Sequence, residues 1–150
     1  MTERKHIPVA LLALALLGGP SAHAQEAPEA RQDMALRGVM KQLGQDMQAV
    51  TGAISEEDWQ LVAQLAPRIG QHEEPPAREK MRILGWLGAD ARKFRNFDLE
   101  LGKGAENLQQ AAEQEDGQAV IAAFGKLQQS CLACHQSFRQ PFVQHFYGER

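Results

Sequence analysis

The sequence predicts an all-α protein that folds as an antiparallel up-down-up-down four-helix bundle. Four segments repeat apolar residues at the three- and four-residue spacings of one helix face, and none sustains the alternation typical of a strand. Most links between these segments are short, which favours antiparallel packing of consecutive helices. The length of 150 residues suggests one domain.

The first 24 residues are interpreted as a secretory signal peptide. Arg4 and Lys5 precede an apolar run over residues 7–17, and residues 22–24 read Ala-His-Ala, a small-x-small cleavage pattern. The apolar run is shorter than the roughly 20 residues that span a bilayer, although an uncleaved anchor is the alternative. We therefore expect cleavage after residue 24 and a mature domain over residues 25–150. That domain would have no membrane span and would be exported to a compartment such as a bacterial periplasm.

The first two predicted helices have clear apolar stripes. The stripe of the first helix consists of Leu36, Met40, Leu43, Met47, Val50 and Ile54. The second helix is expected over about residues 55–71, with Ser55 as its N-cap and Pro67 bending its last turn.

The last two predicted helices are longer. One is expected over about residues 76–113, weakened or bent by Gly102 and Gly104. The other is expected over about residues 117–147, with Pro141 ending or kinking it. In this topology the first helix starts where the last one ends, so we expect residue 40 and residue 135 to face each other at similar heights.

The chain contains two cysteines, Cys131 and Cys134, and His135 follows the second directly. This is the C-x-x-C-H pattern of covalent haem attachment. Thiols three positions apart share a helix face and can reach the two vinyl groups on one porphyrin edge, while the histidine can bind the iron. A redox dithiol would favour a helix N-terminus beside strands, and a zinc site would need two of the histidines at positions 72, 135 and 145. The position of the motif inside a helical pattern, behind an export signal, favours haem.

The net charge of −3 lacks the basic footprint of a nucleic-acid-binding protein, so no nucleic-acid partner is expected. Two basic runs lie in the third predicted helix, over residues 78–82 and 92–95. Most such runs are solvated helix faces. The alternative is that they steer an acidic redox partner.

Two segments resemble class II c-type cytochromes, the cytochrome c′ superfamily. "FGKLQQSCLACHQSFR", residues 124–139, resembles the last helix of that family, and "LRGVMKQLGQDMQAVTGAI", residues 36–54, resembles the first helix of its low-spin relatives. The resemblance implies one haem c attached through Cys131 and Cys134, with His135 binding the iron. In the low-spin relatives a methionine of the first helix binds the opposite face of the iron, and Met40 matches that position. The middle helices match only in their pattern.

The resemblance also suggests the surroundings of the haem. Arg37 and Arg139 would pair with a propionate or cover the proximal side, with solvated arginines as the alternative. Phe138 would pack against the haem. Met40 can instead be a packing residue, in which case Leu36 would line an apolar distal pocket.

We therefore expect a periplasmic mono-haem electron carrier that serves redox partner proteins and performs no enzymatic bond chemistry. One alternative is a five-coordinate, high-spin cytochrome c′ that binds nitric oxide or carbon monoxide. Another is a helical bundle that uses Cys131 and Cys134 without haem. Members of the superfamily often pair through their first two helices, so a homodimer is a further expectation.

Overall fold

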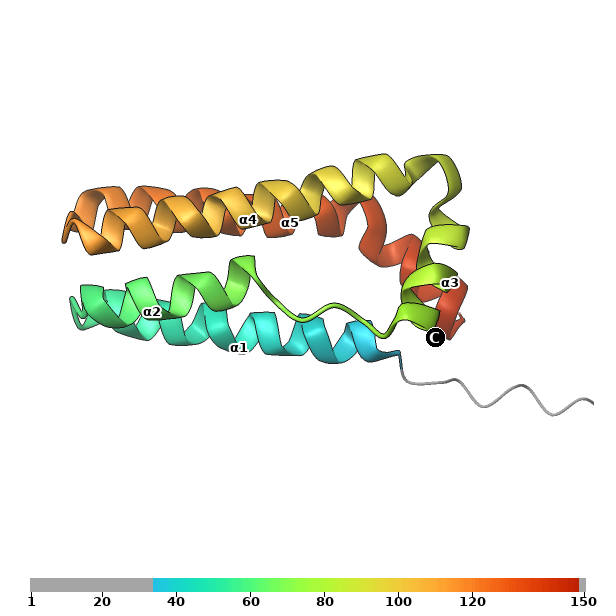
Figure 1. Ribbon diagram of the computed structural model, residues 1–150, viewed down its shortest axis with the longest axis horizontal. Coiled ribbons are helices and arrows are strands. Elements are labelled where there is room, and N and C mark those ends of the chain that lie inside the picture. Colours follow the sequence, from blue (N-terminus) through green and yellow to red (C-terminus); the bar gives the residue numbers. More distant parts are fainter. Residues whose placement is uncertain (1–33, 149–150) are drawn as a thin grey trace, which may run out of the picture. The chain divides into compact units, whose positions relative to one another are not determined.

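The computed structural model describes residues 34–148, so the expected signal peptide, residues 1–24, and the first residues of the expected mature domain lie outside the described part. The described elements are α1 (Ala35–Ser55), α2 (Trp59–Gly70), α3 (Ala77–Leu87), the 3₁₀ turn η1 (Gly88–Asp90), α4 (Ala91–Glu113) and α5 (Gly117–Tyr147). The long helices α1, α2, α4 and α5 form the bundle, and α3 crosses one end of it (Figure 1). The predicted all-α four-helix bundle is confirmed. Within residues 34–148 no helix is both long enough and apolar enough to cross a membrane.

The turn between α1 and α2 differs from the sequence prediction. Ser55 is the last residue of α1, and its hydroxyl donates to the carbonyl oxygen of Thr51 at 2.9 Å. The N-cap of α2 is Asp58, whose carboxylate accepts from the Leu61 backbone N–H at 2.9 Å. The prediction of Ser55 as the cap is therefore wrong, because Asp58 stands one residue before the first helical position and a cap must stand there.

The prediction of a single helix over residues 76–113 is also wrong. The chain breaks at Gly88, whose φ of +51° lies in the left-handed region that glycine adopts without a steric penalty. Gly102 and Gly104 lie inside α4, which continues through both positions. A Cβ at Gly104 would meet the Leu127 Cδ1 at 3.1 Å, so this glycine allows α4 and α5 to approach closely.

The end of α5 is held against α3. The helix continues past Pro141 to Tyr147, and Figure 1 shows its last part bending toward α3. The missing N–H of a proline weakens a helix at that point and permits such a bend. The ring of Trp86 on α3 lies 5.6 Å from the rings of both Phe142 and Phe146.

Helix α3 also closes the start of α1. The carboxylate of Glu79 accepts from the backbone N–H groups of Ala35 and Leu36, both at 2.8 Å. The Met34 N–H donates to the Tyr147 hydroxyl at 3.4 Å. An acidic side chain satisfies the free N–H groups of a helix N-terminus and interacts favourably with its dipole. Residues far apart in the sequence therefore join at this end of the bundle.

The apolar interior consists of two clusters. The tip core lies toward the α1–α2 and α4–α5 turns. Its buried members are Val50, Ala53, Val62, Leu65, Ala66, Ile69, Ala105, Leu108, Ala111, Ala112, Val120 and Leu127. The α3-end core lies at the other end. Its buried members are Met34, Ile83, Leu87 and Phe138, and the partly buried residues around them are Leu36, Leu84, Trp86, Ala91, Phe94, Phe97, Cys134, Phe142, Phe146 and Tyr147.

Candidate functional site

The side chains on the core-facing stripes of α1 and α5 are more exposed to solvent between the two cores than within them. Met40 lies on the apolar stripe of α1, yet it belongs to neither core and is 40% exposed. On α5, Cys131 is half-buried and His135 is exposed, although neighbouring stripe residues such as Leu127 are fully buried. Side chains on the inner side that retain exposure fit a large apolar group packed against them. This level of the bundle is therefore the candidate site.

Met40 and the cysteine motif lie at similar heights. The tip of the bundle provides the reference, because the Trp59 ring packs against Gly117, where an added Cβ would lie 3.0 Å from Cζ2. At about 1.5 Å per residue, Met40 lies about 22 Å from the end of α1, while Cys131 and His135 lie about 21 and 27 Å from the start of α5. Met47 lies only about 12 Å from the end of α1 and packs against the tip core.

Leu36 lies one helical turn from Met40, about 28 Å from the end of α1 and thus also near the height of His135, but in a different environment. It is partly buried against the α3-end core, whereas Met40 packs into neither cluster. Height alone therefore does not separate the two side chains. Packing does, because Leu36 already has apolar neighbours within the protein.

The two thiols are suitably placed for attachment to one group. Cys131 and Cys134 are unpaired and half-buried, three positions apart on α5. Burial raises the pKa of both thiols. For Cys134 the neighbouring Cys131 and the carboxylate of Asp98 raise the pKa further. A planar macrocycle with two reactive positions along one edge fits this pair.

His135 can supply a metal ligand beside these thiols. Its pKa is lowered, first because the surrounding protein partly desolvates the ring and second because Arg139 carries a positive charge nearby. A lowered pKa favours the neutral imidazole, the form whose free nitrogen lone pair binds a metal ion. The donor set of two thiols and one neutral imidazole therefore fits a covalently attached haem.

The sequence reasoning did not identify one residue pair near the site. It joins His72, on the connector between α2 and α3, to Asp98 on α4. The His72 Nδ1 lies 3.1 Å from the Ile69 carbonyl oxygen. The His72 Nε2 lies 3.5 Å from the Asp98 Oδ1. The influence of Asp98 on the pKa of Cys134 places that carboxylate near the motif. The only sign of this pair in the sequence was an acidic residue, Asp98, beside the apolar stripe of α4.

The zinc alternative considered His72 as a ligand. Within the described residues no group of three or more histidine, cysteine, aspartate or glutamate side chains is arranged to hold a metal ion. His72 instead pairs with Asp98.

The remaining predicted site residues lie in different surroundings. The Arg37 guanidinium carbon lies 6.0 Å from the Tyr147 ring centroid, and Arg139 is exposed one turn beyond His135. Phe138 is 8% exposed and packs edge-on against Phe94, with ring centroids 5.4 Å apart. It belongs to the α3-end core that also contains Cys134. Contact of these three residues with a haem stays a prediction.

The family comparison agrees with this site. The family model described as cytochrome C′ matches residues 29–139, a range that runs from before α1 through the cysteine motif to Arg139. A search of curated proteins finds no match. The matched range covers most of the chain, and cytochromes of this family hold haem c covalently through a C-x-x-C-H motif. The chain therefore belongs to the cytochrome c′ family of c-type cytochromes and has covalently bound haem c, with its iron, as its cofactor.

Proposed function

We propose that this cytochrome is a periplasmic one-electron carrier in which His135 and Met40 are the two axial ligands of the haem iron. The observation that carries the proposal is the position of Met40. It lies on the inner stripe of α1, at the height of the cysteine motif, and belongs to neither core. A side chain in this position is available to a group bound on α5.

Each residue of the site then has a defined role. The thiols of Cys131 and Cys134 hold the haem to α5, and the neutral imidazole of His135 binds the proximal face of the iron. The thioether of Met40 would be the second ligand of the iron, and a methionine ligand favours reduced iron and raises the reduction potential. The haem would supply the one-electron chemistry, and the protein supplies attachment, orientation and the electrostatic environment.

The surrounding residues support this arrangement. Arg139 stands one turn beyond His135 and Arg37 one turn before Met40, so both cations are near enough in the sequence to pair with haem propionates. Phe138 packs beside Cys134 and would limit access of water to the haem edge. These roles, the cleavage of residues 1–24 and the mature domain over residues 25–150 form part of the proposal.

Absorption spectra of the purified protein test the axial ligands. We expect low-spin spectra in both oxidation states, a weak sulfur-to-iron band in the near-red and no change on addition of carbon monoxide. Met40→Ala should convert the iron to high spin and allow carbon monoxide to bind. Met47→Ala is the matched control, because Met47 packs against the tip core, and its spectra should remain those of the wild type.

A high-spin wild-type protein that binds carbon monoxide would contradict the Met40 assignment and favour the five-coordinate alternative. An unchanged spectrum in Met40→Ala would also contradict it, because another ligand would then bind the iron. The intact mass of the exported protein tests two further parts of the proposal. It should correspond to a chain that starts at residue 25 and carries one haem that remains attached after denaturation.

A further inference from the structure

Charge is distributed unevenly along the bundle. Residues 42–67 and 104–125, which contain the two turns at the tip, include no lysine or arginine. The acidic residues of these turns are Glu56, Glu57, Asp58, Glu113, Glu115 and Asp116, all exposed. The opposite end carries a cluster of basic residues on α3 and the first turns of α4. The tip is therefore acidic, and the basic residues of α3 and α4 are concentrated at the opposite end.

The solvent face of α3 has the composition of a contact surface. Arg78, Met81 and Arg82 follow one another at helical spacing on this face, and all three are exposed. Met81 is 68% exposed. Methionine and arginine are both enriched in protein–protein interfaces relative to the rest of protein surfaces. The flexible apolar side chain of Met81 can thus contact a partner, and the guanidinium groups of Arg78 and Arg82 lie on either side of that contact.

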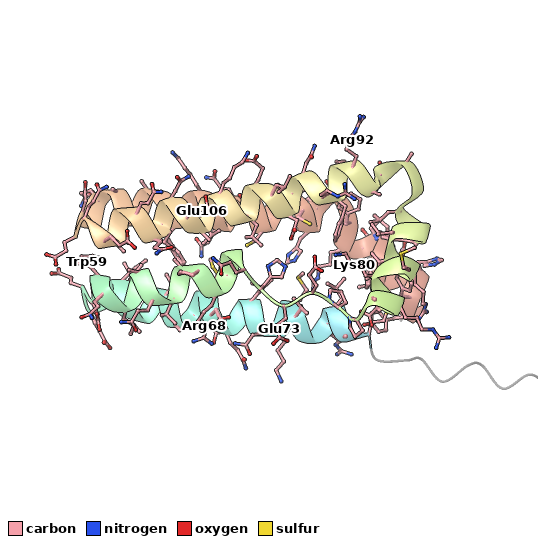
Figure 2. The ribbon with its side chains drawn as sticks, in the orientation of Figure 1. Trp59, Arg68, Glu73, Lys80, Arg92 and Glu106 are labelled. Carbon is pink, nitrogen blue, oxygen red and sulfur yellow. The ribbon has the colours of Figure 1, made fainter. Side chains whose placement is uncertain are left out.

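The start of α4, directly after the turn that ends α3, carries further exposed basic residues. Arg92 and Arg95 share the outer stripe of α4 with Leu99, which is 55% exposed. Figure 2 shows the Arg92 side chain directed away from the bundle. Arg78, Arg92 and Arg95 take part in no ion pair with other residues between 34 and 148. Their positive charges are therefore available to an external partner.

Most acidic residues near this face already form contacts within the protein. The carboxylate of Glu79 binds the N-terminus of α1, and that of Asp98 faces His72. The Lys80 ammonium donates to Glu74 at 2.6 Å, and this hydrogen bond lowers the pKa of the Glu74 carboxyl. Among the described residues at this end, these contacts leave Glu73 and Asp90 as exposed acids without an ion pair.

The face is physically connected to the haem attachment site. On its inner side α3 contributes Ile83, Leu87 and Trp86 to the α3-end core, and Cys134 packs against the same core. A protein docked on α3 would therefore be separated from the attachment cysteine by the side chains of the α3-end core.

We propose that an acidic redox protein docks on the surface formed by Arg78, Met81 and Arg82 of α3 and Arg92 and Arg95 of α4. This inference rests on the proposed electron-carrier function. The acidic tip turns away from a negatively charged partner while the basic end faces it, so the charge separation orients the cytochrome during encounter. The arginines accelerate association, and Met81 supplies apolar contact in the docked complex.

The test measures electron transfer from the reduced, haem-loaded protein to an acidic blue-copper protein by stopped flow over a series of ionic strengths. The wild-type rate should fall as salt rises, because screening weakens attraction between surface charges. The double variant Arg78→Glu/Arg92→Glu should lower the low-salt rate by about tenfold or more and flatten its salt dependence. Both positions lie near helix N-termini, where glutamate is favourable, so folding is preserved.

The matched control is Lys103→Glu/Lys126→Glu, which changes the net charge by the same amount at exposed positions outside the proposed surface. Its rate should stay within about twofold of the wild type, since steering depends on where the charges lie. Equal losses in the two double variants would overturn the proposal, because the rate would then depend on net charge alone. A rate that rises with salt would also overturn it. Met81→Ser should lower the rate while leaving its salt dependence unchanged.

Binding of poly-L-glutamate to the haem-loaded protein separates this proposal from the proposed function. The NMR signal of the Met81 methyl group should shift on titration in the wild type, and the shift should be lost in Arg78→Glu/Arg92→Glu. This measurement needs no electron transfer, so it tests the surface even if the axial ligands differ from those proposed. Peptide that instead perturbs only residues away from α3 would refute the docking surface.

Discussion

The two ends of the bundle are built in different ways. The buried members of the tip core are aliphatic and come from the α1–α2 and α4–α5 pairs, which pack on each other through α2 and α4. Val62, Leu108 and Leu127 are fully buried. The α3-end core is aromatic and depends on contacts between distant parts of the chain, such as that from Glu79 to Ala35. The haem attachment motif starts between them at Cys131, and its second cysteine, Cys134, packs against the α3-end core. The comparison shows that the tip completes its own core, whereas the other end combines a core with a binding site.

The largest expected effect comes from removing the covalent attachment. In Cys131→Ser/Cys134→Ser the haem loses both bonds to α5, so we expect haem to separate from the chain on denaturation and in the mass spectrum. Native-state hydrogen exchange should show weaker protection in α3 and the last turns of α5. The helix ends that flank the α1–α2 and α4–α5 turns should be much less affected. Equal loss of protection at both ends would contradict the contrast between the two cores.

Matched truncations in the two cores should separate stability from the haem environment. Leu108→Ala in the tip core should lower the free energy of unfolding by about 2–5 kcal/mol, because it leaves a cavity in a fully buried site. Leu87→Ala in the α3-end core should destabilise the protein by a similar amount and should also change the haem spectrum, since Cys134 packs in the same cluster. Denaturant unfolding and absorption spectra measure the two effects. If Leu108→Ala changed the haem spectrum and Leu87→Ala did not, the tip core and not the α3-end core would determine the haem environment.

The smallest expected effect concerns the corner that separates α3 from α4. Gly88→Ala should destabilise by about 1–2 kcal/mol, because Gly88 has a positive φ that an alanine adopts only with strain. Gly85→Ala is the matched control, since Gly85 lies inside α3 with nothing within 4 Å of an added Cβ. It should stabilise the protein by about 0.5–1 kcal/mol, because alanine favours the helix. Thermal unfolding of both variants checks the opposite signs, and a stabilising Gly88→Ala would argue against the corner seen here.

Much of the fold could be predicted because helical periodicity is a local property. The stripe from Leu36 to Ile54 and the last helix through Tyr147 were both correctly identified. The break at Gly88 could not be predicted from periodicity. A lone glycine inside a helical pattern is compatible with either a continuous helix or a turn, and the packing of α3 across the bundle selects the turn.

The candidate site shows the same division. Cys131, Cys134 and His135 are adjacent in the sequence, so their chemistry could be predicted from spacing alone. The pairing of His72 with Asp98 and the influence of Asp98 on Cys134 could not, because these residues come from a connector and two different helices. No periodic pattern in the sequence marks side chains that meet across a bundle.

The sequence by itself determined the helical class, the haem attachment motif and the family resemblance, because each depends on residues close together in the chain. Only the tertiary structure decided that the core divides into two clusters, that Met40 belongs to neither of them, and that the arginines of α3 and α4 lie at the end opposite the acidic turns. The physical reason is that burial and surface charge depend on which helices pack together and where the chain turns. Those choices arise from contacts such as Glu79 with the start of α1 and Trp86 with the end of α5.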